Sequence, residues 1–420
     1  MYLTYEALRD AVAGGAVALR MRTELAPAGG PDDKFFPPTY GVKDQAPTKY
    51  AVETRTVDGR QVTDVVVDSV ASQANRLEQA LRAGWEAGEL TFPNAYVDFT
   101  VDPELVDLGQ VSALDAPHRI ADAIFRDSLL DGTLFRLSDA GRAVTEARPL
   151  AATGMFVHSP TSLLFGVWDS TGPKGGLGAK FQRAISSEIM AFDVTLGVKT
   201  ASRIDPLAIE RSAAKIYEAA EHDEAWVIDE AKAKTDDKGK HVLYGKTSDK
   251  GRPSQINHGN VTPSIDTRAG GIRASRIEQV AVMSLAALRR LRFPVDHSGA
   301  PLQGDVRNQA EISARAAIAA LGVAALAYSY EMDFDLRSRC LLVPKRAPRM
   351  ELLNRDGSDP IEVTSDRHGA ARLLEDAARS TAEAGLPRSS GSLRLVPSPK
   401  LIDLIKRSRD PIIAEETGAD

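Results

Sequence analysis

The stretch from Ser159 to Arg183, SPTSLLFGVWDSTGPKGGLGAKFQR, constrains the fold of this chain more than any other. Its apolar run, residues 163–168, has the length and composition of a strand and ends at a turn. Glycines after the turn allow backbone N–H groups to approach an anion, and we expect a helix over 179–190. The stretch therefore favours phosphate contact, although a glycine-rich connection with solvated lysines explains the same residues. The residues expected at a phosphate are Lys174, Gly175, Gly176, Lys180 and Arg183.

Two common nucleotide-binding loops do not fit this stretch. A Walker A loop ends in Gly-Lys-Ser/Thr, whereas Lys180 lies between Ala179 and Phe181. A dinucleotide fingerprint that starts at Gly176 needs a third glycine at position 181, which is Phe181. The sequence thus disfavours a nucleotide-binding enzyme built on residues 172–180.

Charge is distributed unevenly along the 420 residues. The whole chain has a net charge of −6, but residues 246–292 alone carry +6, so the remainder carries −12. A basic region on an acidic body is typical of nucleic-acid binding. The polar stretch 252–264, RPSQINHGNVTPS, lies in this region and suits contacts to phosphates, sugars and bases. The expected contact residues are Arg252, Asn257, His258, Asn260, Arg268 and Arg273.

Two groups nearer the N-terminus have similar chemistry. Alternation over residues 17–22 predicts a strand with Arg20 and Arg22 on one face. A helix predicted over 68–82 begins with hydroxyls, amides and a guanidinium, which suit a nucleic-acid backbone. An N-capped helix with a solvated face explains the same residues equally well. The residues of this helix start are Ser72, Gln73, Asn75 and Arg76.

Periodicity and breaker residues predict the other elements. We expect helices over 5–13, 115–127, 206–220, 275–292, 309–328, 367–384 and 399–407, and strands over 50–57, 62–67, 95–101, 188–196 and 339–343. The longest apolar run, 316–328, is too short to span a bilayer, and no secretory signal is visible, so we expect a cytoplasmic protein. A single cysteine, Cys340, excludes an internal disulfide and a cysteine-based zinc site. His118 and Asp115 lack any hydrolase motif, and we expect no catalytic residue, metal or cofactor.

Four stretches together resemble one protein family. They are DSVASQANRLEQAL at 68–81, DAPHRIADAIFRDS at 115–128, SPTSLLFGVWDSTGPKGGLGAKFQRA at 159–184 and RPSQINHGNVTPS at 252–264. The chain resembles the backbone-forming RAMP subunit of CRISPR interference (Cascade) complexes, the seventh Cas family, in its type I-U or I-G form. Ser72 and Gln73 followed by the basic Arg76 also look like the helix-start pattern of other backbone RAMP subunits.

The resemblance implies an α+β fold with an RRM-like (ferredoxin-type) core and large insertions that form thumb and finger elements. The chain would then be one such domain over 1–420. Within it we expect a Pro/Gly-rich loop at 26–45, a polar basic loop or thumb insertion at 232–271, and a C-terminal helical extension at 345–420. We also expect residues 234–271 to be mobile in the free protein, because they offer little apolar surface to bury.

The function implied by the resemblance is binding, without catalysis. The partners would be CRISPR RNA, further copies of the chain, other Cascade subunits, and target DNA through the guide, with no membrane and no cofactor. The alternative is a guide-dependent, metal-requiring RNase, since RAMP subunits of type III systems cleave with a loop aspartate. Asp33 and Asp169 are the acids nearest suitable loops, but neither has a second carboxylate at metal-ligand spacing.

Overall fold

The longest strands lie together in one sheet. Among the described residues it contains nine strands, in the order β16-β17-β1-β15-β10-β3-β2, with β18 pairing to β1 and β19 to β18. β1 is antiparallel to β15 on one side and to β17 and β18 on the other. The strands are β1 Ala16–Pro27, β2 Val52–Val57, β3 Arg60–Asp68, β10 Ile185–Leu196, β15 Ile272–Ser284, β16 Phe334–Asp335, β17 Leu341–Pro344, β18 Arg349–Asn354 and β19 Ile361–Val363.

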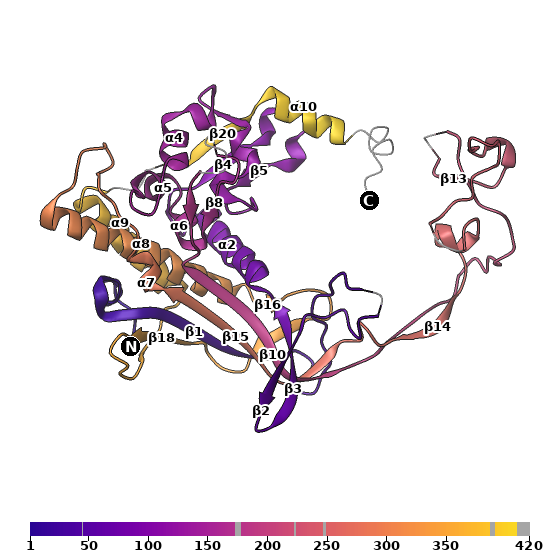
Figure 1. Cartoon of the computed structure of the whole chain (residues 1–420), viewed down its shortest axis with the longest axis horizontal. Helices are drawn as coiled ribbons and strands as arrows, with labels where there is room; N and C mark the ends of the chain where they lie inside the picture. The colour runs from indigo at the N-terminus through magenta and orange to yellow at the C-terminus, as the bar shows by residue number, and fades with distance from the viewer. Residues whose placement is uncertain (44, 173–177, 222–223, 247–248, 387–390, 410–420) are drawn as a thin grey trace. The chain divides into compact units, whose positions relative to one another are not determined.

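Helices cover one face of this sheet (Figure 1). α2, Val70–Glu86, packs against α8, Gly304–Glu331, and α8 packs against α9, Arg367–Glu383. Leu19 and Met21 of β1 belong to the same buried core as these helices. Alternation along β1 therefore places Arg20 and Arg22 on the opposite face of the sheet. Along the chain, β1, α2, β10, β15, α8 and β18 follow one another, and four of them lie in the sheet in the order β18-β1-β15-β10.

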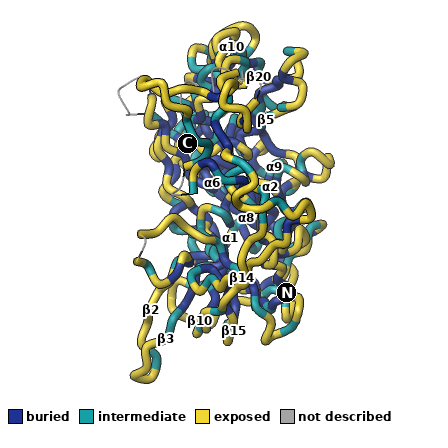
Figure 2. Tube along the Cα trace, turned by 90° about the vertical axis from the view of Figure 1, so that its right-hand side faces the viewer, coloured by how far each residue is buried: buried dark blue, intermediate teal, exposed yellow. Residues whose placement is uncertain are grey.

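Local sequence signals explain where the helices begin. The side chains of Thr4, Ser69 and Asp366 accept hydrogen bonds from backbone N–H groups in the first turns of α1 (Tyr5–Asp10), α2 and α9. In α2, position 84 requires glycine, because a Cβ there would lie 2.7 Å from the Tyr328 Cε1 and 2.7 Å from the Leu90 Cδ1. Figure 2 shows that buried positions cluster around α2, α6 and α8, whereas β2 and the turn after it are exposed.

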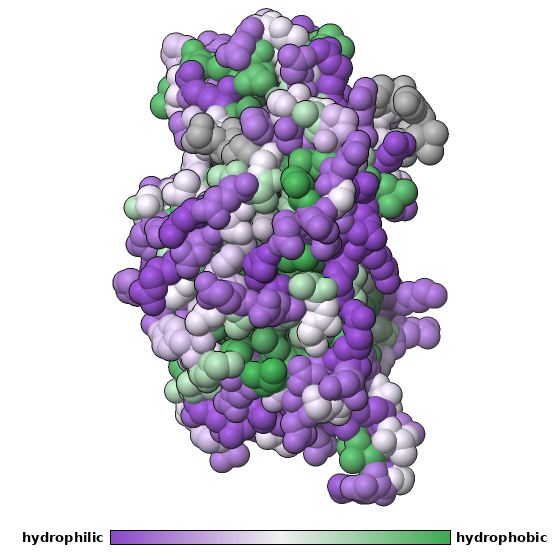
Figure 3. Space-filling view, turned by 90° about the vertical axis from the view of Figure 1, so that its left-hand side faces the viewer, coloured by the Kyte–Doolittle hydropathy of each residue, from purple (hydrophilic) through white to green (hydrophobic). Residues whose placement is uncertain are grey.

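α8 is the longest helix of the described chain and contains a long apolar window. By length and composition it passes as a membrane-crossing helix, but 94% of its apolar window is buried inside the protein. Outside the core, a face of the molecule shows small apolar areas among predominantly hydrophilic side chains (Figure 3).

A second sheet combines four strands from residues 95–134 with β20, a strand close to the C-terminus. Its strands have the order β5-β4-β20-β6-β7, and β20 pairs in parallel with β4. Its strands are β4 Ala95–Asp98, β5 Gln110–Ser112, β6 Ser128–Leu130, β7 Thr133–Leu134 and β20 Leu393–Pro397. The remaining short elements are α3 Ala123–Arg126, α4 Asp139–Thr145, α5 Thr153–His158, α6 Pro160–Phe165, β8 Val167–Trp168, β9 Lys180–Phe181, α7 Leu285–Leu288, which packs against β1 and α8, and α10 Pro399–Ser408. The segment 345–420 thus contributes β18, β19 and β20 as well as α9 and α10.

The computed structural model describes residues 1–43, 45–172, 178–221, 224–246, 249–386 and 391–409. Unit 1 comprises residues 1–38, 51–195 and 273–406. It contains the elements named so far, except the last residue of β10, the first of β15 and the last two of α10. Unit 2 comprises residues 39–50, 196–272 and 407–420. Its elements are β11 Lys199–Arg203, β12 Tyr217–Glu218, β13 Trp226–Val227 and β14 Val261–Asp266, and β11 pairs antiparallel with β14. The basic segment expected at 232–271 lies within the longer stretch 196–272 of unit 2.

The structure confirms several predicted elements and corrects others. The predicted helices 68–82, 309–328, 367–384 and 399–407 correspond to α2, α8, α9 and α10. The predicted strands 50–57 and 62–67 correspond to β2 and β3, which pair as a hairpin that turns at Asp58 and Gly59. The prediction of a helix over 275–292 was wrong, because that segment is β15 followed by the single turn α7. Its apolar residues also alternate, and pairing with β1 and β10 selects the strand.

Four further assignments were wrong. Of the strand predicted over 163–168, residues 163–165 belong to α6 and only 167–168 form a strand, β8. All six residues of α6 are buried, so the sequence shows neither a helical nor a strand period there. The helix expected over 179–190 is β9 and the start of β10. Residues 115–127 form only short turns and α3. Residues 206–220 form no helix, since Ala208 has a φ of 50° and the segment folds around a buried carboxylate described below.

Candidate nucleic-acid interface

The ribbon β8–β9 carries the most distinctive exposed surface of unit 1. Gly166, with a φ of 82°, turns the chain from α6 into β8, and Trp168 pairs with Lys180 across the ribbon. Alternation buries Val167 and turns Trp168 outward, leaving it 57% exposed. The Lys180 Nζ lies 5.1 Å from the centre of the Trp168 ring. An exposed indole beside an ammonium can stack on a base and contact its phosphate.

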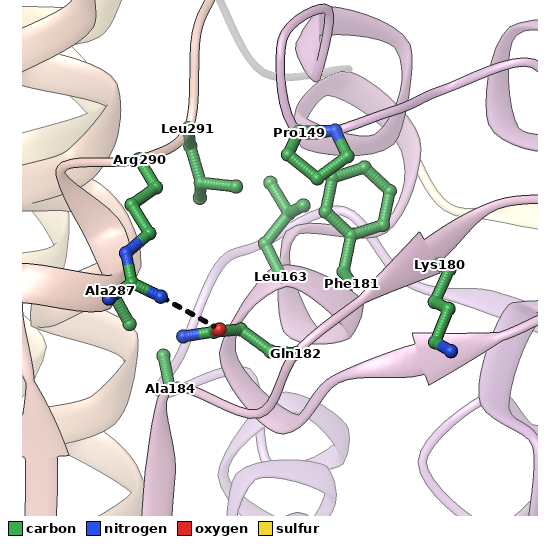
Figure 4. Close-up of a pocket in the computed structure, with 9 residues that line it drawn as sticks. All are labelled: Pro149, Leu163, Lys180, Phe181, Gln182, Ala184, Ala287, Arg290 and Leu291. Atoms are coloured by element: carbon green, nitrogen blue, oxygen red, sulfur yellow. Dashed lines mark hydrogen bonds between the residues drawn. The ribbon is translucent and has the colours of Figure 1, made fainter.

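A pocket of about 270 Å³ opens beside this ribbon (Figure 4). Its wall is apolar, and at its rim the Arg290 Nη1 donates to the Gln182 Oε1 over 3.2 Å. Lys180 also lines it. The remaining lining residues are Pro149, Leu163, Phe181, Ala184, Ala287 and Leu291. The pocket thus offers an apolar wall next to two cations and an amide.

Lys180, Arg183 and Arg290 are exposed and form no ion pair with any residue in the described ranges. Although Arg183 is exposed as a residue, partial desolvation of its guanidinium and the neighbouring Arg119 lower its pKa, and the nearby Glu78 carboxylate acts in the opposite direction. A guanidinium nevertheless remains charged at neutral pH. Unpaired cations gain most from an added phosphate, because no internal ion pair has to break. We call Trp168, Lys180, Gln182, Arg183 and Arg290 the ribbon surface. Of the predicted phosphate residues, Lys174, Gly175 and Gly176 lie outside the described residues.

The predicted residues at the start of α2 gather around Asp68, which is fully buried. Its carboxylate accepts hydrogen bonds from the Ser72 Oγ at 2.8 Å and the Gln73 Nε2 at 2.7 Å. The Arg76 Nε and the Arg337 Nη2 each donate to it at 2.9 Å. Ser72, Gln73 and Arg76 therefore have intramolecular partners, and Asp68 is the residue that brings them together.

Gln73 also ties α2 to the sheet. It is 2% exposed, and its Oε1 accepts from the Ser187 Oγ on β10 and the Gln279 Nε2 on β15, both at 2.8 Å. Asn75 lies on the exposed face of α2. Burial of Gln73 makes it a structural link between helix and sheet, and Asn75 alone of the four residues presents its side chain fully to solvent.

Arg20 and Arg22 are joined to carboxylates on neighbouring strands. The Arg20 Nη2 lies 2.7 Å from the Glu351 Oε2 on β18, and the Arg22 Nη2 lies 2.6 Å from the Glu278 Oε1 on β15. Glu351 and Glu278 are buried, while both arginines keep about a third or more of their side chains exposed, 31% and 44%. The two arginines do share a face, as predicted, but as members of ion pairs.

In unit 2, a cationic cleft surrounds Arg252. The cleft has a volume of about 690 Å³ and is lined by Arg211, Lys215, Lys250 and Arg252 with Ser212, Ala214, Leu243 and Gly251. Asp249 pairs with Arg252 at 2.8 Å and with Arg211 at 3.1 Å. Four cations against one carboxylate leave the cleft positive, which suits an anion.

The other predicted residues of the 252–264 stretch shape a turn around Asp205. Backbone N–H groups of Leu207, Ile209 and Gly259 donate to this buried carboxylate, and the Asn260 Oδ1 accepts from the Asp205 N–H at 2.7 Å. Burial opposes ionisation of Asp205, but these backbone bonds outweigh it and lower its pKa, with a further contribution from His258.

The remaining predicted residues, Asn257, Arg268 and Arg273, each take part in a hydrogen bond between a guanidinium and a backbone carbonyl. Asn257 has a φ of 61°, and its carbonyl accepts from the Arg203 Nη2 at 2.7 Å. The Arg268 Nη2 donates to the Lys43 carbonyl at 3.3 Å, within unit 2. The Arg273 Nε donates to the Asp32 carbonyl at 3.0 Å, within unit 1. The predicted residues thus form separate groups, each with its own local partners.

The two acids weighed for RNA cleavage have local partners. Asp169 is 3% exposed, and both its oxygens lie 2.7 Å from the Arg136 Nη2. The Asp33 Oδ1 accepts from the Lys34 N–H at 2.7 Å. Within the described ranges no three His, Cys, Asp or Glu side chains lie close enough to hold a metal ion.

Sequence reasoning missed several members of these surfaces. Trp168 was hidden in an apolar run, and its outward direction depends on β8 starting after Gly166. Arg290 and Gln182 come from distant segments that meet only in the fold. The four-cation cleft was detectable in part, because Lys250 and Arg252 belong to the basic region, while Arg211 and Lys215 fell in a segment read as a helix.

Comparison with known proteins adds one finding. A search of curated proteins gives no significant match. A family model described as CRISPR-associated protein GSU0053 matches residues 19–196, less than half of the chain. The matched region begins in β1, contains α2 and the ribbon β8–β9, and ends with β10. The match supports a CRISPR-associated (Cas) protein.

Proposed function

We propose that the chain is a non-catalytic, RNA-binding backbone subunit of a CRISPR interference complex. The observation that carries the proposal is the ribbon surface, where exposed Trp168 lies against Lys180 and the neighbouring cations form no ion pair with any described residue. Stacking on an indole and contact to phosphate are the two elements of sequence-tolerant binding to single strands. A subunit that presents a guide for pairing needs this kind of contact, since the base edges must stay free.

We further propose that the core is RRM-like, of the ferredoxin type. The order β18-β1-β15-β10, with α2 following β1 and α8 following β15, supports this proposal. Such a βαββαβ unit is the core expected for RAMP proteins. In this proposal unit 2 is the thumb insertion between β10 and β15.

The proposed partners are CRISPR RNA, further copies of the chain, other subunits of the complex, and target DNA through the guide, in the cytoplasm. The four-cation cleft of unit 2 supports a second contact to a nucleic-acid backbone. The RNase alternative is disfavoured because the Asp169 carboxylate is already bound by Arg136, and a metal would have to displace that guanidinium.

Binding of single-stranded RNA to the purified protein, measured across salt concentrations, tests the proposal. Lys180→Ala should reduce the slope of log K against log salt by about 0.7, the share of one phosphate on a single strand, for unrelated RNA sequences alike. Trp168→Ala should weaken binding by about 1–3 kcal/mol with little change in slope. Arg379→Ala removes an exposed arginine of α9 that pairs with Asp376, and serves as the matched control.

An unchanged slope in Lys180→Ala, or a loss confined to one RNA sequence, would contradict backbone contact at the ribbon surface. A wild-type protein that fails to bind single-stranded RNA at low salt would remove the proposed function.

A further inference from the structure

Arg119 is a nearly buried arginine with an unusual backbone. It begins a 3-10 turn, Arg119–Ala121, with a φ of 53°, a conformation that costs energy for a residue with a Cβ. Its side chain is 13% exposed. A strained, buried cation persists only where surrounding contacts stabilise it.

Its guanidinium joins two other segments of unit 1. The Arg119 Nε and Nη2 donate to the two Glu78 carboxylate oxygens at 2.6 and 2.9 Å. The Arg119 Nη1 donates to the Gly166 carbonyl at 3.0 Å, and the guanidinium carbon lies 5.5 Å from the centre of the Phe165 ring. Three stretches distant in sequence, α2, the 119–121 turn and the α6–β8 junction, therefore meet at one side chain.

Gly166 in turn sets the place of Arg183. A Cβ on Gly166 would lie 2.8 Å from the Arg183 backbone nitrogen, so the two backbones are in direct contact. The adjoining ladder is fixed by hydrogen bonds from the Ala184 N–H to the Leu164 carbonyl at 2.8 Å and from the Asp169 N–H to the Ala179 carbonyl at 2.9 Å. A displacement of the Gly166 carbonyl would therefore move Arg183 and the ribbon.

We propose that Arg119 is a positioning residue, which with Glu78 anchors the Gly166 turn and so holds Arg183 and the β8–β9 ribbon in place for RNA. The inference rests on the proposed function. Arg119 does not itself contact RNA in this arrangement, because its donors are directed at Glu78 and Gly166 and its side chain is mostly buried. Lysine cannot replace it, because a single ammonium cannot bridge both carboxylate oxygens and the carbonyl as a planar fork does.

A double-mutant cycle on RNA binding tests the proposal, with Arg119→Lys, Arg183→Ala and the double variant. Arg119→Lys keeps the net charge, yet it should lose at least as much affinity as Arg183→Ala and lower the salt slope by at least the same amount, about 0.7, because the ribbon moves with Arg183. The double variant should bind no more weakly than Arg119→Lys alone. Arg379→Lys, on the exposed ion pair of α9, is the matched control and should leave binding unchanged.

Additive losses in the double variant, or a lower melting temperature with wild-type RNA affinity, would show that Arg119 has a purely structural role. If Arg119→Lys does not fold, Glu78→Gln provides the second variant. It weakens the same anchor while preserving its shape, but it also removes a negative charge near Arg183, so its readout is hydrogen exchange and not RNA affinity. Exchange at residues 164–169 and 179–184 should increase by a smaller factor than in Arg119→Lys, and wild-type exchange would overturn the proposal.

Hydrogen–deuterium exchange gives a readout that does not depend on RNA. Arg119→Lys should speed exchange at residues 164–169 and 179–184 and leave α9 unchanged. Unaltered exchange at these residues would overturn the positioning role. If the wild-type protein bound no RNA but the exchange increased as expected, the proposed function would fail while the anchor from Arg119 to the ribbon would stand.

Discussion

Replacement of Asp68 by asparagine should destabilise unit 1 strongly. The Asp68 side chain is fully buried and accepts four hydrogen bonds, two of them from Arg76 and Arg337. Asparagine has one acceptor oxygen, and its amide would face donors. Removing one partner of a buried ion pair costs about 3–5 kcal/mol. Because Arg76 and Arg337 are 30% and 26% exposed, water replaces part of the lost contact, and we expect the low end, about 3 kcal/mol.

That loss corresponds to a melting temperature lower by about 4–5 °C for a unit of this size, measurable by circular dichroism. Asp139→Asn is the matched control. Asp139 is 99% exposed in its pair with Arg142, and its replacement should cost less than about 0.5 kcal/mol. Equal melting temperatures for the two variants would refute the view that Asp68 organises the start of α2.

Three other predictions follow from single groups. Burial raises the pKa of the Cys340 thiol to about 11, so at pH 8 iodoacetamide should modify the folded protein about 100-fold more slowly than the urea-unfolded chain, and equal rates would contradict its burial. The lowered pKa of Asp205 stabilises unit 2 fully above the ordinary value of 3.8 and less as the pH falls below it. Proteolysis of residues 196–272 should therefore stay constant down to a pH of 3.8 and increase below it, and Asp205→Asn should show that increase already at pH 7. Asp169→Ala leaves Arg136 without its carboxylate partner and should lower the free energy of unfolding by about 3 kcal/mol. The wild-type protein, incubated with guide and complementary RNA in Mg²⁺ or Mn²⁺, should leave both strands intact. Cuts that vanish in Asp169→Ala at unchanged stability would support the RNase alternative.

The elements that were predictable from sequence are those whose signals are local. Ser69 caps α2, Asp366 caps α9, and the Asp58-Gly59 turn fixes the β2–β3 hairpin. β15 was mistaken for a helix because Ile277, Val280, Ala281 and Leu288 fit a helical period, and only its neighbours β1 and β10 decide the matter. The hydrophobic pattern of a short segment does not show which distant strands it will pair with, and this explains the wrong assignment of β15.

The candidate site was predictable in its residue types and less so in its geometry. Lys180 and Arg183 were identified from the charge of the central stretch, and they are exposed and unpaired in the described structure. Arg20 was expected to be equally available, but its carboxylate partner, Glu351, is 331 residues away in sequence. The sequence shows which charged side chains are present, but the fold decides which of them form ion pairs with one another and which stay available to a ligand.

The most direct test of the central claim is ultraviolet crosslinking of single-stranded RNA to the purified protein, followed by mass spectrometry of the crosslinked peptides. Our account predicts crosslinks in the peptide that contains Trp168 and in the peptides around Lys180 and Arg290, all of which weaken as salt rises. Crosslinks confined to other parts of the chain, with none at the ribbon surface, would contradict it.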